Sequence, residues 1–90
     1  MNRWEISLSR EALKFLRRNH FPQAKIIEPV VLAIKKLSGE NTNIDIKKLN
    51  PPYEDHFRIR VGRTRIICCP DFVSRSVSVR EINWRGSSYK

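Results

Sequence analysis

An alternation of apolar and basic residues from Phe57 to Val61 most constrains how this chain folds. Successive side chains of a β-strand point to opposite faces, so Phe57, Ile59 and Val61 are predicted to face a core while Arg58 and Arg60 share the other face. A rise of ~3.3 Å per residue holds the two guanidinium groups about 7 Å apart, a spacing suited to binding phosphate. An ordinary solvated strand face is the alternative interpretation.

The N-terminal half is predicted to contain one strand and two helices. Trp4 to Leu8 alternates as a strand does, and Ser9 suits the N-cap of a helix with apolar residues at positions 12, 13 and 16. The pattern breaks at Asn19 to Pro22, and apolar residues then recur at helical spacing from Ile27 to Leu37. Within this second helix Pro29 is expected either to kink the helix or to lie in its first turn.

The C-terminal half is predicted to be a meander of three antiparallel strands, after a short extended segment at Ile44 to Leu49. The strands are Phe57–Val61, Thr64–Cys69 and Ser76–Ile82, joined by turns at Gly62–Arg63 and Pro70–Arg75. The order β-α-α-β-β-β predicts a single two-layer α+β domain over residues 1–90. In it a helical hairpin packs on a twisted, mainly antiparallel sheet whose other face is partly open.

Composition predicts a cytoplasmic protein that does not span a membrane. No apolar run approaches the ~18 residues of a spanning helix, and the N-terminus lacks the apolar region of a secretory signal. Cys68 and Cys69 are adjacent on a predicted strand and point to opposite sides, which predicts two free thiols in a reducing compartment. Together with His20 and His56 they match no known metal-ligand spacing, so neither a metal nor a cofactor is expected.

The charge balance predicts a polyanionic partner. The chain has 18 Lys and Arg residues against 9 Asp and Glu residues, which gives a net charge of +9 on 90 residues. Nucleic acid is the first candidate partner, followed by an anionic membrane surface or an acidic protein segment. Charge alone does not reveal whether a bound nucleic acid is cut.

Three motifs in order suggest a family. They read Phe57-Arg58-Ile59-Arg60-Val61, then Thr64-Arg65-Ile66-Ile67, then Arg85 with Tyr89 four residues later. With the predicted element order, they resemble the RelE/ParE superfamily of toxins from prokaryotic type II toxin-antitoxin pairs. That family shows a Tyr/Phe-basic-Ile-basic strand, a following Tyr-Arg-hydrophobic segment and a closing Arg-to-Tyr segment. The resemblance covers nearly the whole chain and favours the RelE-like branch.

The resemblance implies a ribosome-dependent messenger-RNA endonuclease that acts in the ribosomal A site and is held inactive by a cognate antitoxin. The implied catalytic residues are Arg58, Arg60, Arg65, Arg85 and Tyr89. Further RNA contacts are expected from Lys47, Lys48, Arg63 and Trp84. Cleavage by the 2′-hydroxyl of RNA needs cations around the phosphorane and no metal, which agrees with the scattered acidic residues of the C-terminal half. Tyr89 is expected to stack on a base or to orient the hydroxyl.

The proton acceptor stays open because the family often carries lysine where this chain has Arg60, and arginine is not ordinarily deprotonated. Water, His56, Lys47 and Lys48 remain candidates. Trp84 stands where some relatives carry histidine, which replaces a base with a stacking surface. Two other functions are therefore kept: a ParE-type toxin that binds and poisons gyrase, and a noncatalytic basic RNA-binding domain.

Overall fold

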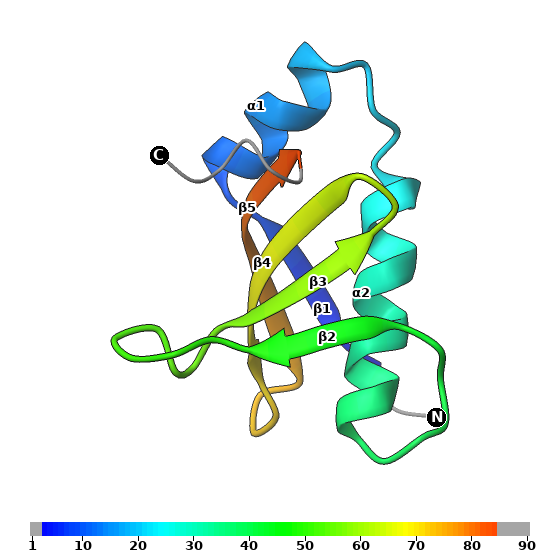
Figure 1. The fold of residues 1–90 in the computed structure, drawn as a ribbon, viewed down its shortest axis with the longest axis vertical. Helices are drawn as coiled ribbons and strands as arrows, with labels where there is room; N and C mark the ends of the chain where they lie inside the picture. Colours follow the sequence, from blue (N-terminus) through cyan, green and yellow to red (C-terminus); the bar gives the residue numbers. More distant parts are fainter. Residues whose placement is uncertain (1–2, 85–90) are drawn as a thin grey trace.

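A computed structural model describes residues 3–84, which form one five-stranded sheet covered by two helices (Figure 1). In chain order the elements are β1 (Glu5–Leu8), α1 (Arg10–Arg18), α2 (Ala24–Leu37), β2 (Asp45–Lys48), β3 (Phe57–Val61), β4 (Thr64–Asp71) and β5 (Ser76–Trp84). The strand order is β1-β5-β4-β3-β2, with β1 parallel to β5 and all other neighbours antiparallel. The predicted two-layer α+β fold is confirmed, and the short extended segment before β3 is a fifth strand.

The two helices begin and end where local chemistry allows. Ser9 is the N-cap of α1, as predicted: its Oγ accepts a hydrogen bond from the backbone N–H of Ala12 at 3.1 Å. At the start of α2 the Pro22 carbonyl accepts a hydrogen bond from the Lys25 N–H, and the Gln23 carbonyl accepts from the N–H groups of residues 26 and 27. The helix therefore begins at Ala24, earlier than the apolar repeat from Ile27 predicted. Pro29 consequently lies inside α2 and is buried, rather than in the first turn.

The hydrophobic core lies between the helices and the sheet. The helix residues Ala12, Ile26 and Val30 meet the strand residues Ile59 and Ile66, and each of these five is at most 1% exposed. Both helices pack on this face, α1 against β5 and β1 and α2 against β3. In Figure 1, β2 crosses in front of α2, which leaves the opposite face of β2 and β3 away from the helices.

Val61 does not fill the core, although the alternation predicted that it would. It has the same orientation as Ile59, but it is 36% exposed at the end of β3. There it borders an open hollow of about 420 Å³ whose other walls include Phe21, Pro29 and Trp84. The strand continues past the end of the core, so alternation alone overestimates burial at this position.

The last two strands, β4 and β5, are each two residues longer at their C-terminal ends than the sequence predicted. β4 runs through Pro70 to Asp71, and β5 extends two residues beyond Ile82. Pro70 is tolerated in the strand because β3 begins opposite Cys68, so the missing N–H of Pro70 breaks no hydrogen bond to β3.

Cys68 is buried in the core, Cys69 is half-buried, and both thiols are free, as expected. Over residues 3–84, neither helix is long and apolar enough to cross a membrane.

Candidate nucleic-acid interface

The strand register aligns mostly polar side chains in two rows on the face of the sheet that the helices leave uncovered. One row crosses from Asp45 through Arg60 and Arg65 to Asn83. The second row, two residues away along each strand, contains Lys47, Arg58, Ile67 and Glu81. Directly opposite residues have Cβ atoms about 5 Å apart, so the three arginines occupy adjacent positions on two paired strands. We call Lys47, Arg58, Arg60 and Arg65 the basic face.

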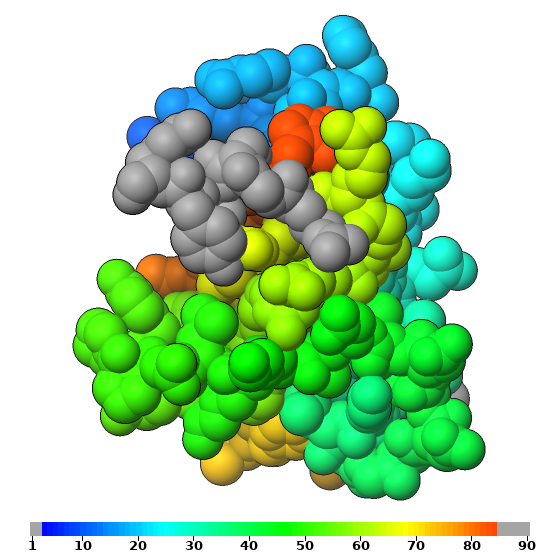
Figure 2. All heavy atoms as spheres, viewed as in Figure 1, coloured from blue at the N-terminus to red at the C-terminus, as the bar shows by residue number. Residues whose placement is uncertain are grey.

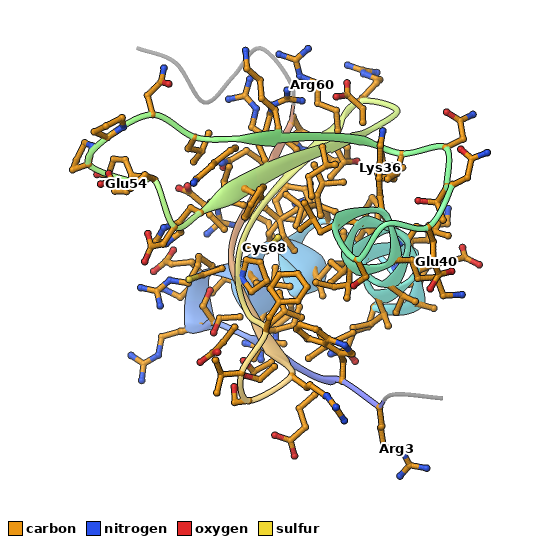
Figure 3. The ribbon with its side chains drawn as sticks, turned by 90° about the horizontal axis from the view of Figure 1, so that it is seen from below. Arg3, Lys36, Glu40, Glu54, Arg60 and Cys68 are labelled. Atoms are coloured by element: carbon orange, nitrogen blue, oxygen red, sulfur yellow. The ribbon has the colours of Figure 1, made fainter. Side chains whose placement is uncertain are left out.

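The pictures show on which side of the sheet Arg60 lies. In Figure 3, Arg60 lies on the side of the sheet away from α2, and Cys68 lies on the inner side. In Figure 2, the green and yellow-green atoms of β2, β3 and the turn before β4 form one continuous surface.

Two arginines of the basic face, Arg58 and Arg65, are unusually well buried for charged side chains. Arg58 is 9% exposed and Arg65 is 6% exposed, whereas most arginines lie at the surface. Arg58 is paired with Asp45, with 3.4 Å between its Nη1 and Asp45 Oδ1. Asp45 is more than half exposed, so this ion pair contributes little to stability and mainly restricts where the Arg58 guanidinium points.

Arg60 supplies a hydrogen-bond donor that the described chain does not satisfy. Its Nε is buried, and no atom of residues 3–84 accepts a hydrogen bond from it. Arg60 also lies directly opposite Arg65, a like-charge pair that is unfavourable in a sheet. An anion bound beside Arg60 and Arg65 would reduce their repulsion and would accept a hydrogen bond from the Arg60 Nε–H. The like-charge pair and the unsatisfied donor therefore both favour binding of a phosphate group.

The other residues predicted to contact RNA are distributed over both faces. Lys47 is exposed on the basic face opposite Arg58, whereas Lys48 pairs with Phe57 and belongs to the opposite face. Trp84 also belongs to the helix-covered face, where its ring lies 5.2 Å from Phe15 between ring centroids.

Arg63 is exposed in the turn between β3 and β4 and lines the same hollow as Trp84. The structure therefore separates Arg63 and Trp84 from the basic face, and their role as RNA contacts stays a prediction. Arg85 and Tyr89 lie outside the described residues, so the structure does not test their positions.

Sequence reasoning missed Asp45 and Asn83, which complete the row of Arg60 and Arg65. A period of two identifies side chains that share a face of one strand, but it does not give the register between strands. Register here depends on the turn at Gly62, whose φ of +58° lies in the left-handed region that glycine adopts readily. No signal in the sequence alone would have found Asp45.

Comparison of the sequence with family models and with curated proteins finds no significant match. Comparison of the structure with solved structures finds several. A chain of the RelB-RelE antitoxin-toxin complex from Methanococcus jannaschii is similar with a TM-score of 0.59 and 23% identity, over 93% of this chain and 95% of that chain. YafQ from E. coli strain BL21(DE3) gives a TM-score of 0.65 with 10% identity, over 98% and 100% of the two chains.

A third similar structure is the toxin-antitoxin complex RelBE2 from Mycobacterium tuberculosis. Its matching chain has a TM-score of 0.60 and 19% identity, with 91% of this chain and 98% of that chain covered. Nearly complete coverage in both directions means that the whole arrangement of helices and strands is shared. This chain therefore shares the fold of the matching chains in these RelE and YafQ structures, in agreement with the fold that its sequence motifs predicted.

Proposed function

We propose that this protein is the toxin of a type II toxin-antitoxin pair and a ribosome-dependent messenger-RNA endonuclease of the RelE type. Its fold is that of chains found in toxin-antitoxin complexes. The observation that carries the nuclease proposal is the basic face, where Arg58, Arg60 and Arg65 lie together on two paired strands. Arg85 and Tyr89, which belong to the same family motif, complete the proposed site.

The proposed reaction is attack of an RNA 2′-hydroxyl on the adjacent phosphorus atom. The 2′-oxygen loses its proton and bonds to phosphorus, the bond from phosphorus to the 5′-oxygen breaks, and that oxygen takes up a proton. The products are a 2′,3′-cyclic phosphate and a 5′-hydroxyl. Because the phosphorane carries additional negative charge, Arg58, Arg65 and Arg85 would stabilise it more strongly than the substrate.

Rigid positioning supports this role for Arg58 and Arg65. Both side chains start from paired strands in the middle of the sheet and are largely buried, so few rotamers are open to them. Asp45 restricts Arg58 further. Donors that are already oriented need little reorganisation when charge develops, which is why such groups lower a barrier effectively.

Geometry narrows the candidates for the proton acceptor. Lys47 lies on the basic face opposite Arg58, whereas Lys48 belongs to the other face. His56 precedes β3 and is held by Asp55, with 2.7 Å between His56 Nδ1 and Asp55 Oδ1. We favour Lys47, because it lies opposite Arg58 and next to the arginines that would hold the phosphate, with a water molecule as the alternative.

A cognate antitoxin is the proposed protein partner. Similar chains are found in RelB-RelE and RelBE2 complexes, and the sheet here ends in two short edge strands, β1 and β2. An exposed strand edge accepts an added strand, and a basic face attracts an acidic helix. A helix on the basic face would cover the arginines directly, whereas a strand added at an edge would hold the antitoxin beside them, and either would keep the toxin inactive in the cytoplasm until the antitoxin is removed.

Induced expression followed by primer extension on cellular transcripts tests the proposed function. We expect growth arrest with cuts inside translated codons, and loss of both in Arg65→Ala and in Arg85→Ala. Arg17→Ala is the matched control, because Arg17 is an exposed arginine on α1. Circular dichroism of each purified variant separates loss of activity from loss of fold.

Two results would contradict the proposal. Undiminished arrest in the Arg65→Ala, Arg85→Ala double variant would reject this site. Arrest with intact transcripts and a DNA-damage response would instead favour a gyrase poison of the ParE type, and RNA binding without arrest or cleavage would favour a noncatalytic RNA-binding domain.

A further inference from the structure

A second cluster of functional groups lies at the other end of β3 from Arg60. Asp55 and His56 end the loop that leads into β3, and Cys69 lies near the end of β4. One nitrogen, one sulfur and one carboxylate oxygen from these three residues all lie within 4.8 Å of one another. The proposed function does not use this cluster, and the proposal below does not depend on that function.

We propose that Asp55, His56 and Cys69 form a binding site for one zinc ion. Imidazole nitrogen, thiolate sulfur and carboxylate oxygen are the three protein ligand types that zinc takes, and three protein ligands with one water is a common zinc coordination. The thiolate disfavours Mg²⁺ and Ca²⁺, which prefer oxygen ligands. Two anionic ligands would balance the charge of the ion.

The distances fit a tetrahedral ion after small side-chain movements. Bonds of 2.0 to 2.3 Å at a tetrahedral angle place neighbouring ligand atoms roughly 3.3–3.6 Å apart. In the structure Asp55 Oδ2 lies 3.9 Å from Cys69 Sγ, and Asp55 Oδ1 lies 2.7 Å from His56 Nδ1. These two distances involve different oxygens of Asp55, whereas one oxygen would bind the ion. One ligand atom from each of the three residues lies within 4.8 Å of the others, so the widest separation must close by at most about 1.5 Å, which side-chain rotations can supply.

The backbone around the cluster already holds two of the three ligands. The N–H of His56 donates to the Tyr53 carbonyl at 2.9 Å, and the His56 carbonyl accepts from the Leu49 N–H at 3.0 Å. The Tyr53 ring stands edge-on to the imidazole, with 5.9 Å between centroids. Cys69 is fixed by pairing of β4 with β5 opposite Ser78. These contacts limit the entropy lost when an ion binds.

The local exposure and charge allow an ion to enter. The Asp55 side chain is 73% exposed, which provides access from solvent, whereas that of His56 is only 19% exposed. Burial and the neighbouring Asp55 raise the pKa of the Cys69 thiol, so an ion must displace the thiol proton to bind, while the hydrogen bond from His56 lowers the pKa of Asp55. The charge of Arg80 acts to lower the pKa of both groups, and it opposes binding of another cation. The carboxylate and the thiolate together outweigh this single positive charge.

The site was hidden in the sequence because its ligands come from two segments. Asp55 and His56 are adjacent, but Cys69 belongs to a different strand, and the spacing matches no known zinc motif. The fold brings them together because Phe57 pairs with Cys68, which places the residues just before β3 beside Cys69. A bound ion would fasten the loop before β3 to β4.

Cobalt titration of the metal-free, untagged protein tests the site, because a thiolate bound to Co²⁺ gives a charge-transfer absorption band. We expect saturation at one Co²⁺ per chain, displacement of the band by one equivalent of Zn²⁺, and a rise in the melting temperature with Zn²⁺. Cys69→Ser should abolish the band. Asp55→Asn and His56→Gln should each weaken Co²⁺ binding by at least ~10-fold, as expected when a ligand is removed.

Matched controls are Cys68→Ala and His20→Ala, which should leave binding unchanged because neither residue belongs to the cluster. The proposal is overturned if no thiolate band forms, if the band depends on Cys68 instead of Cys69, or if His56→Gln binds Co²⁺ as tightly as the wild type. If Cys69→Ser fails to fold, Asp55→Asn and His56→Gln still decide the matter, since both keep the thiol.

Discussion

Individual residues of the basic face combine burial with charge, a costly combination that needs compensation. A buried charge loses hydration, and the loss is offset only by ion pairs or hydrogen bonds. Asp45 gives Arg58 a distant partner, at 3.4 Å. For Arg60, the described residues leave the buried Nε without an acceptor. A surface that keeps such a donor is better explained by binding an anion than by stability of the free protein.

The buried thiol of Cys68 predicts how the stability of the protein changes at alkaline pH. Burial, with a smaller contribution from Cys69, raises the pKa of the Cys68 thiol from 9.0 to about 12. The unfolded thiol ionises first, so the stability contributed by the protonated thiol is complete below about pH 9 and is lost as the pH rises toward 12. At ~1.4 kcal/mol per pH unit, the loss at pH 10.5 is roughly 2 kcal/mol.

Urea unfolding of wild type and Cys68→Ala at pH 8 and pH 10.5 measures this effect. The variant should be less stable at pH 8, because it leaves a small cavity, but it should lose roughly 2 kcal/mol less than the wild type between the two pH values. Cys69→Ala is the control for a half-buried neighbouring thiol and should keep most of the decline. An equal decline in wild type and Cys68→Ala would contradict the prediction.

At the scale of elements, Ser9 joins the first strand, the first helix and the last strand. Its Oγ accepts from the Ala12 N–H at the start of α1 and donates to the Arg80 carbonyl of β5 at 2.6 Å. The Ser9 N–H also donates to the Val79 carbonyl at 2.9 Å. The register of β4 and β5 shifts beside Arg80, so this contact supports an irregular part of the sheet.

Ser9→Ala removes both side-chain hydrogen bonds and should lower the free energy of unfolding by about 1–3 kcal/mol. Ser7→Ala is the matched control, because Ser7 is exposed on β1, and it should change the free energy by less than ~0.5 kcal/mol. Chemical denaturation with a two-state fit measures both. A loss no greater than that of Ser7→Ala would show that neither contact of Ser9 stabilises the fold.

The elements were more predictable than the contacts between them. Helical periodicity identified both helices, and alternation identified β3 and the faces of Ile59 and Arg58, because these patterns reflect burial within one element. The exposed position of Val61 and the length of β4 depend on where neighbouring elements end. Those limits are set by packing and pairing over long sequence distances, which no local pattern records.

The candidate site was predictable to the same extent. Arg58 and Arg60 follow from one strand, and Arg65 joins them because the tight turn at Gly62 sets the register. Asp45 and the cluster of Asp55, His56 and Cys69 come from separate segments, so only the assembled sheet brings them together. Motif order therefore identified three arginines that the sheet brings together, but not the groups beside them, and the function of these arginines stays a prediction.

On the scale of the whole molecule, positive charge alone does not distinguish the helix-covered side of the sheet from the side with the basic face, because both sides carry basic side chains. Arg10, Lys14, Arg17 and Arg18 are exposed on α1, which packs on the face opposite the arginines of the sheet. The basic face differs in the order of its arginines, which are aligned across paired strands and are buried or half-buried, so their side chains have little freedom. A flexible cation on a helix loses more side-chain entropy when it binds phosphate.

This difference predicts how salt affects binding to a short single-stranded RNA. Each phosphate neutralised by the protein contributes ~0.7 to the slope of log Kd against log salt concentration. Arg60→Ala should weaken binding and reduce the slope by about 0.7, because it removes an ordered phosphate contact. Arg17→Ala makes the same change in net charge on α1 and should leave the slope unchanged. Fluorescence anisotropy over a salt series measures both. Equal losses in the two variants would mean that RNA responds to the overall charge of the protein rather than to the basic face.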